Sequence, residues 1–239
     1  IKEVSYPLNA IRYTLKYEYD SNSNRTKLTY PDSTYISYNY DELNRLLSVS
    51  TTYPFSTKTL SYTFDKVGNK KSLTYPDSIA TLNYTYDTLN RLVQITDDRG
   101  QKTEYAYDSA SRLIKKTLPN GVYTEYNYDN LNRLLSLLNK KNDASVISTF
   151  SYTHDNVGNR VTMDERRGTT DVGMHTYTYD KLYQLKSVDY PLGASFPDKT
   201  FSYDGVGNRT QTVDGGTTNY TPNNLNQYTK VGSTDYTYD

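Results

Sequence analysis

Pairs of aromatic residues, separated by one polar residue and followed at once by aspartate, recur along the whole chain. The clearest copies read Tyr-x-Tyr-Asp and occupy residues 38–41, 84–87 and 126–129. Side chains alternate between the two faces of a β-strand, so both aromatics of a copy lie on one face. Eleven copies, two of them degraded or cut short, succeed one another at intervals of 16 to 26 residues. This pattern predicts short strands throughout and requires no helix.

The residues after the aspartate take one of two forms. The first reads Asp-x-Leu-Asn-Arg-Leu, as in Asp41 to Leu46, and the second reads Asp-x-Val-Gly-Asn-Arg/Lys, as in Asp65 to Lys70. We expect the aspartate to cap a tight turn by accepting hydrogen bonds from amides ahead of it. Asparagine or glycine would supply the positive φ that such a turn needs. The extra residue of the second form predicts a longer loop or a bulge.

These positions are structural residues of the repeat, which pack the sheet and shape its turns. The set comprises Tyr38, Tyr40, Asp41, Asn44, Arg45, Tyr84, Tyr86, Asp87, Asn90, Arg91, Tyr126, Tyr128, Asp129, Asn132, Arg133, Gly68, Gly158 and Gly207. The arginine after asparagine is expected to stack on a neighbouring tyrosine or to pair with a turn aspartate.

A second turn closes each repeat about ten residues later, for example at residues 31–33, 76–78 and 119–121. Each repeat is therefore strand, turn, strand, turn. About ten full repeats and a truncated last copy would form one array over residues 1–239. The predicted fold is all-β, with about 20 strands in antiparallel hairpins, and a sheet of that size curls or spirals.

Composition explains how such a sheet could hold together at a mean hydropathy of −0.83. The chain has 28 tyrosines, which can bury the ring and keep the hydroxyl at a wet edge. Lys plus Arg equals Asp plus Glu, at 27 each, which argues against nucleic acid as a partner. No apolar run approaches the ~20 residues of a membrane span, so no membrane insertion is expected. The chain begins at Ile1 without an initiator methionine, which suggests a fragment of a longer chain.

Little in the sequence indicates catalysis. His154 and His175 are interpreted as packing or turn residues, and each turn offers too few oxygen ligands for Ca²⁺. We predict no catalytic, cofactor-binding or metal-binding residues and no enzymatic activity. Residues 164–168 are expected to form a solvated loop. The longer stretches 139–148, 164–174 and 190–199 are expected to be loops that could carry specificity.

The repeated Tyr-x-Tyr-Asp-x-x-Asn/Gly-Arg-Leu motif closely resembles the YD repeat of the rearrangement-hotspot (RHS) and YD-repeat proteins, from Tyr17 to Asp239. The resemblance implies β-hairpins in a continuous spiralling sheet. In large bacterial members, such as Tc toxins, this sheet forms a shell around a toxin. In teneurins it belongs to an adhesion ectodomain, and YD repeats have also been linked to carbohydrate binding. The resemblance also implies an extracellular or cell-surface location, in a bacterium.

The sequence departs from the toxin-shell pattern at one point, because no proline follows an aspartate and the Asp-Pro self-cleavage motif is missing. Twenty strands, curled into one ring, would span roughly 30 Å and could not enclose a folded domain of similar width. We therefore expect a non-enzymatic scaffold or shell segment that encloses a toxin only within a larger shell. Its partners would be neighbouring repeats of the same chain. The alternatives are an adhesion or glycan-binding module, and a filament or ring subunit that self-associates through hairpin edges.

Overall fold

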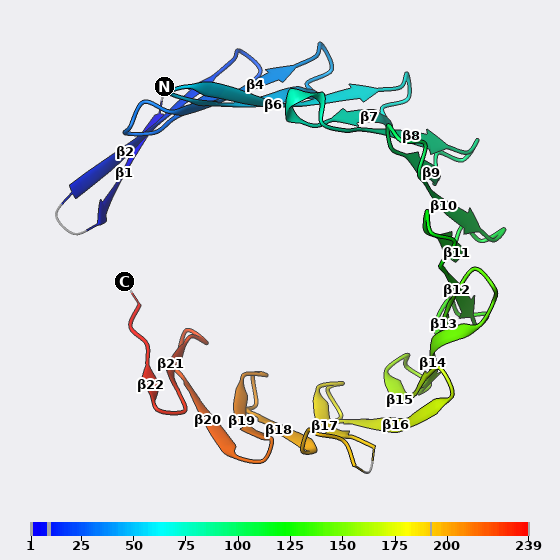
Figure 1. The fold of residues 1–239 in the computed structure, drawn as a ribbon. Coiled ribbons are helices and arrows are strands. Elements are labelled where there is room, and N and C mark those ends of the chain that lie inside the picture. The colour runs from blue at the N-terminus through cyan, green and yellow to red at the C-terminus, as the bar shows by residue number, and fades with distance from the viewer. Residues whose placement is uncertain (1, 9–10, 192, 239) are drawn as a thin grey trace. The chain divides into compact units, whose positions relative to one another are not determined.

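The computed structural model describes residues 2–8, 11–191 and 193–238. Its chain folds into two compact units, Ile1–Ala106 and Tyr107–Asp239, which are described separately. In both units, strands follow one another in chain order and each pairs antiparallel with its neighbour (Figure 1). The predicted all-β fold of repeated antiparallel hairpins is confirmed.

The first unit contains β1 (Lys2–Leu8), β2 (Ile11–Tyr19), β3 (Arg25–Thr29), β4 (Tyr35–Tyr40), β5 (Leu46–Tyr53), β6 (Ser56–Phe64), β7 (Lys70–Thr74), β8 (Thr81–Tyr86), β9 (Leu92–Thr96) and β10 (Lys102–Tyr107), whose last residue belongs to the second unit. A single 3₁₀ turn, Pro76–Ser78, joins β7 to β8. The second unit contains β11 (Leu113–Thr117), β12 (Tyr123–Tyr128), β13 (Leu134–Lys140), β14 (Val146–His154), β15 (Arg160–Arg167), β16 (Thr170–Tyr179), β17 (Leu185–Asp189), β18 (Lys199–Tyr203), β19 (Arg209–Val213), β20 (Thr217–Pro222), β21 (Tyr228–Val231) and β22 (Thr234–Asp235).

Two kinds of ladder alternate along each sheet. Within a repeat, pairing starts at the fifth residue after the turn aspartate, as in Tyr128 opposite Leu134. Between repeats, pairing starts only at the seventh residue, as in Lys27 opposite Ser37 and Lys115 opposite Glu125. The fifth and sixth residues therefore have no partner in the ladder to the next repeat. Consecutive repeats part at this end of the strands, and side chains must join them there.

Both forms of the turn have the same loop, which corrects the expectation of a longer loop in the second form. Asp41 donates its backbone N–H to the carbonyl of Arg45, and Asp65 likewise to that of Asn69, each four residues on. The residue of positive φ is the third after the aspartate in both, Asn44 at 59° and Gly68 at 97°. The alternative expectation, a bulge, is met in both forms, because the sixth residue after the aspartate, Leu47 or Lys71, is the extra residue in the ladder within the repeat. Glycine thus replaces asparagine as the third residue after the aspartate in the second form. The basic residue is the fourth after the aspartate in the first form and the fifth in the second.

Two of the three stretches predicted as loops are instead extended hairpins. Residues 139–148 continue β13 and β14 around a tight turn, and residues 164–174 continue β15 and β16 around the turn at Gly168. Most residues in these two stretches are polar or charged, so the sequence lacks the apolar alternation that would have indicated strands. Residues 164–167 therefore lie in β15 and not in a solvated loop. Between β17 and β18, the described residues form no strand.

Side chains in these sheets are mostly half-buried, as expected where one layer of strands carries the structure. Among the residues whose side chains the structure describes, Leu28, Tyr177 and Val188 form the buried apolar set. Stability therefore rests on contacts between adjacent strands more than on a thick core. Within the described part of the chain, no helix has the length and apolar character needed to cross a membrane.

Candidate functional site: the aspartate turn edge

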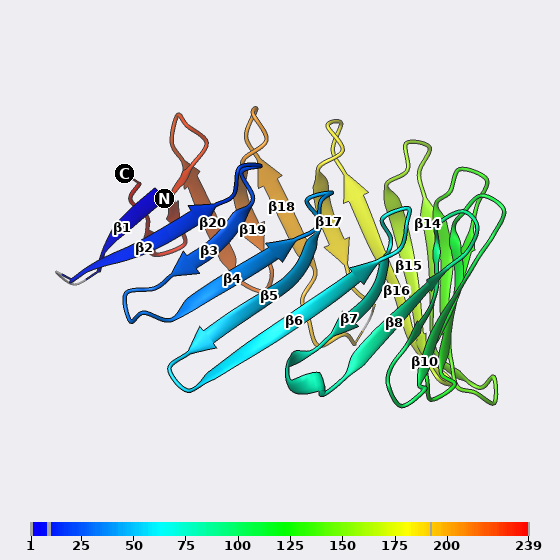
Figure 2. The ribbon, with the colours of Figure 1, turned by 90° about the horizontal axis from the view of Figure 1, so that it is seen from above.

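All the aspartate turns of a unit lie along one edge of its sheet, because successive hairpins run in the same direction. Figure 2 shows this edge in the second unit, at the turns after β14, β16, β18 and β20. We call the set of turns that begin at Asp20, Asp41, Asp65, Asp87, Asp108, Asp129, Asp155, Asp180, Asp204 and Asn223 the turn edge.

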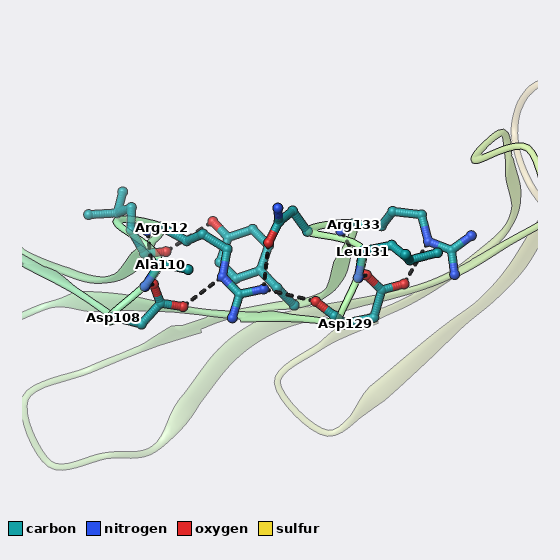
Figure 3. Close-up of polar contacts among 9 residues, drawn as sticks. Asp108, Ala110, Arg112, Asp129, Leu131 and Arg133 are labelled. Atoms are coloured by element: carbon teal, nitrogen blue, oxygen red, sulfur yellow. Dashed lines mark hydrogen bonds and ion pairs between the residues drawn. The ribbon is translucent and has the colours of Figure 1, made fainter.

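The turn at Asp129 shows how the carboxylate holds the loop (Figure 3). Its Oδ1 accepts hydrogen bonds from the backbone N–H groups of Leu131 at 2.8 Å and Arg133 at 2.9 Å. Its Oδ2 accepts from Nε of Arg133 at 2.6 Å. Asn132 takes the positive φ, at 64°. The backbone N–H of Arg133, partly offset by burial and aided by the guanidinium, holds the pKa of Asp129 below its ordinary value of 3.8. The carboxylate is therefore ionised and fully engaged at neutral pH.

The other first-form turns repeat this geometry. Arg45, Arg91 and Arg112 donate Nε to Asp41, Asp87 and Asp108 at 2.7, 2.7 and 2.6 Å. Asn44 and Asn90 have φ of 59° and 60°.

In the second form, asparagine takes the place of arginine beside the carboxylate. Asn69 donates its side-chain amide to Oδ2 of Asp65 at 3.0 Å, and Asn159 and Asn208 do the same to Asp155 and Asp204. Gly68, Gly158 and Gly207 supply φ of 97°, 98° and 94°. The basic residue then falls on the aromatic face, where Arg160 lies 4.4 Å from the ring centre of Tyr177 and Arg209 lies 4.7 Å from that of Phe201.

Several turns in each unit also donate a side-chain hydrogen bond to the next turn along the edge. Arg112 Nη1 donates to the carbonyl of Asp129 at 2.8 Å (Figure 3). Arg133 Nη1 donates to the carbonyl of Asp155 at 2.8 Å. In second-form turns the asparagine serves instead, since Asn69 Nδ2 donates to Oδ1 of Asn90 at 3.0 Å. The turn edge is therefore a line of hydrogen bonds that joins consecutive repeats where their backbones part.

The second tyrosine of the motif makes another contact between repeats. Its hydroxyl donates to the carbonyl of the residue five positions after the preceding turn aspartate, which the ladder to the next repeat does not reach. This contact is present from Tyr40 to Arg25 at 3.1 Å, Tyr86 to Lys70 at 2.9 Å, Tyr128 to Leu113 at 2.9 Å, Tyr179 to Arg160 at 3.0 Å and Tyr203 to Leu185 at 2.9 Å. Burial raises the pKa of Tyr86 and Tyr128, so these hydroxyls remain donors.

The first tyrosine of the motif lies on the same face and contacts cations. Arg25 lies 4.6 Å from the ring centre of Tyr38, and Lys70 lies 5.8 Å from that of Tyr84. Burial also raises the pKa of Tyr84. Tyr126 occupies the equivalent place in β12 and is half-buried.

His154 interrupts the tyrosine series. It stands where a second tyrosine would donate to the carbonyl of Leu134, five residues after Asp129, and its side chain has no hydroxyl to make this contact. A hollow of about 360 Å³ opens there, lined by Leu134, Tyr152, His154, Arg160 and Tyr179. Nδ1 of His154 is buried and has no hydrogen-bond partner in the described part of the chain. Histidine is too short to complete the contact between these two repeats.

Sequence reasoning missed a second polar cluster in the second unit. Glu165, only 7% exposed, accepts from Nε of Arg167 at 2.7 Å, and Nε2 of His175 lies 3.5 Å from its other oxygen. The signal that could have found Glu165 is its two-residue spacing from Met163, which places both on one face of β15. Within the described residues, no three His, Cys, Asp or Glu side chains cluster closely enough to hold a metal ion.

A groove lies at the opposite edge of the first unit. It has a volume of about 590 Å³ and is lined by Tyr30, Pro31, Asp32, Thr34, Ile36, Thr51 and Tyr53. Both tyrosines are partly exposed, at 36% and 51%. Their rings and the nearby hydroxyl and carboxylate groups form a mixed apolar and polar surface.

Fold and turn edge together define a β-hairpin repeat protein whose polar side chains join each repeat to the next. Two family models match the chain, the RHS repeat over residues 19–58 and the teneurin YD-shell over residues 55–170. Together the two matches cover residues 19–170, and over this stretch they confirm the resemblance of the repeats to those of RHS and YD-shell proteins. No curated protein matches the sequence.

Three solved structures are similar in fold to this chain. They are TcdB2-TccC3 with Cdc42 (18% identity, TM-score 0.65), TcdB2-TccC3 without its hypervariable C-terminal region (18%, 0.66) and the Photorhabdus luminescens Tc holotoxin pore with the TccC3-D651A mutation (17%, 0.59). The matches cover 92%, 91% and 90% of this chain but only 15%, 15% and 16% of those chains. At these identities the likeness concerns the fold alone.

Proposed function

We propose that the chain is a non-enzymatic structural segment, a stretch of wall within a longer exported YD-repeat protein. The observation that carries this proposal is the use made of its polar side chains. The arginines, asparagines and tyrosine hydroxyls at the turn edge bind the adjacent repeat rather than converging on a cleft. In this role the partners are neighbouring repeats of the same longer chain. A toxin would be enclosed only by a larger shell to which this segment contributes.

The family and fold support this proposal, since the matched models describe RHS repeats and a YD-shell. An extracellular or cell-surface location in a bacterium forms part of it. A segment of wall at such a location must survive proteases.

Protease resistance tests the structural role. The chain has 27 lysines and arginines, so an unfolded or mobile array would offer trypsin many sites. We expect the purified chain to remain largely intact under native conditions, apart from trimming at its ends. The Asp129→Ala variant, which loses three acceptor contacts in one turn, should be cut near that turn. Rapid cleavage of the wild-type chain within many of its hairpins would overturn the proposal.

The groove between Tyr30 and Tyr53 favours a second candidate, a surface that binds carbohydrate for adhesion. Partly exposed aromatic rings can stack on sugar rings, and Asp32 and Thr34 offer hydrogen bonds beside them. On a glycan array, this candidate predicts retention that Tyr53→Ala abolishes while the circular dichroism spectrum stays unchanged. If folded protein retains no glycan on the array, the carbohydrate-binding candidate is refuted and the structural role is the remaining one.

A further inference from the structure

The second residue after the turn aspartate is aliphatic in most repeats, and it is exposed. The exposed fraction lies between 59% and 76% at Leu43, Val67, Leu89, Leu131, Val157, Leu182, Val206 and Leu225. We call the last five of these, which stand on consecutive turns of the second unit, the aliphatic row. Such a repeated exposure of large apolar side chains on one edge is unusual for a surface that faces only water.

The turn itself does not need an aliphatic side chain at this position. Leu131 contributes its backbone N–H to Oδ1 of Asp129, a contact that any residue except proline could make. Ala110 occupies the same place in the preceding turn and makes the same contact to Asp108 at 2.9 Å (Figure 3). Turns of this kind ordinarily favour polar residues. The leucines and valines are therefore available for a contact outside their own repeat.

Spacing gives the row a regular form. Consecutive turns of the edge are two strands apart, which is about 10 Å where the strands are paired and more at the turn edge, where consecutive repeats diverge. The five side chains thus stand at roughly equal intervals along one edge of the second unit. A partner that buries all five needs apolar side chains at the same interval. The aliphatic row of a second copy has this interval because it is formed by the same turns.

The charge along the row favours the same partner. The residues immediately before the five aliphatics are Asn130, Asn156, Lys181, Gly205 and Asn224, of which only the lysine is charged. The carboxylates of Asp129, Asp155 and Asp204 are occupied by backbone N–H groups and by an arginine or asparagine side chain. Asp180 accepts from two backbone N–H groups, and the last turn begins with the uncharged Asn223. Two such edges can therefore approach each other without strong repulsion and without a need for a charged partner.

We propose that the aliphatic row is an interface that pairs with the same row of a second YD-repeat segment, which in solution is a second copy of this chain. A two-fold arrangement would let each row interdigitate with the other. The inference deepens the structural role proposed above and rests on it, because a wall larger than one sheet needs contacts between sheet edges.

The oligomeric state of the full chain tests the interface. Sedimentation equilibrium from micromolar to submillimolar concentration should show a monomer–dimer equilibrium. A triple variant, Leu131→Gln, Leu182→Gln and Leu225→Gln, should weaken the dimer by at least about tenfold in Kd. The matched control is Leu118→Gln, Val146→Gln and Ile147→Gln, three partly exposed aliphatics outside the turn edge, and it should dimerise like the wild type. Circular dichroism and hydrogen exchange verify that both variants keep the sheet.

A wild-type chain that stays monomeric throughout the range would overturn the interface. So would a dimer that the triple variant leaves unchanged, which would indicate pairing through end strands instead. A dimer weakened equally by both variants would show that the contact is not specific to the row. A monomeric but protease-resistant chain removes the interface and keeps the structural role, whereas a protease-labile chain removes the structural role itself.

Discussion

His154 marks the repeat junction at which the structure predicts a gain in stability from a single substitution. In five other repeats the second tyrosine donates its hydroxyl to a carbonyl of the preceding repeat, at 2.9 to 3.1 Å. At His154 the space for that hydroxyl is a hollow, and Nδ1 is buried without a partner among the described residues. Replacing His154 with tyrosine should restore the contact, this time to the carbonyl of Leu134.

Two contributions set the magnitude. A new intramolecular hydrogen bond contributes about 1 kcal/mol net, and removal of a buried unpartnered polar atom recovers about 1 kcal/mol or more. The hollow is already present and open, so the larger ring need not displace its neighbours. We therefore expect His154→Tyr to stabilise the second unit by about 2 kcal/mol. In a unit of this size that raises Tm by roughly 4–8 °C.

Urea and thermal denaturation at neutral pH measure the change, and hydrogen exchange in β13 and β14 assigns it to the second unit. His154→Phe is the matched control, because it adds the ring without the hydroxyl and should gain about 1 kcal/mol less than tyrosine. Tyr128→Phe provides the reverse test, with an expected loss of about 1 kcal/mol. The reasoning fails if the tyrosine variant is no more stable than the phenylalanine variant, or if both are less stable than the wild type.

Three further predictions concern the turn edge. The pKa of Asp129 is lowered in the folded state, chiefly by the backbone N–H of Arg133, and the same holds at the other first-form turns. The free energy of unfolding should therefore be constant above about pH 5 and fall as the pH drops through 3.8 and below. Urea midpoints measured as a function of pH test this expectation. Arg112→Lys should cost about 1–2 kcal/mol, because an ammonium cannot bind Asp108 and the next turn together, whereas Lys70→Arg should change stability little. Equal urea midpoints for these two variants would contradict that account. Gly158→Ala should lower the free energy of unfolding by about 1–2 kcal/mol because of the φ of 98°, since the added Cβ would meet nothing within 4 Å. Gly158→Asn should lower it less in the same urea assay.

The motif allowed the hairpin and its turn to be predicted well, because every part of that signal is local. Tyr-x-Tyr gives the strand face, and Asp41 and Asn44 give the cap and the positive φ within four residues. The predicted longer loop at Gly68 was wrong for a physical reason. Turn geometry fixes the distance from aspartate to the residue of positive φ, and the distance to the basic residue carries no information about loop length.

The contacts between repeats could not be predicted, because they depend on where the second ladder begins. No residue pattern shows that pairing between repeats starts at the seventh residue after the aspartate and leaves the fifth carbonyl to a tyrosine hydroxyl. Glu165 was missed for a related reason. Its charged sequence context resembles a solvated loop, and only the strand pairing shows that it lies 7% exposed opposite Phe150.

The two turn forms meet the same structural requirement, which is to join consecutive repeats near the aspartate turns, where their backbones are not paired. In the first form one arginine does three things: Arg112 binds its own aspartate, reaches the next turn, and lies 5.0 Å from the ring centre of Tyr128. In the second form two residues divide these tasks, since Asn69 binds the aspartate and the next turn while Lys70 contacts the aromatic rings. Both forms therefore keep a cation on the aromatic face and a donor to the next turn. This equivalence explains how repeats of different sequence can follow one another in a sheet with no change in loop length, as a structural array requires.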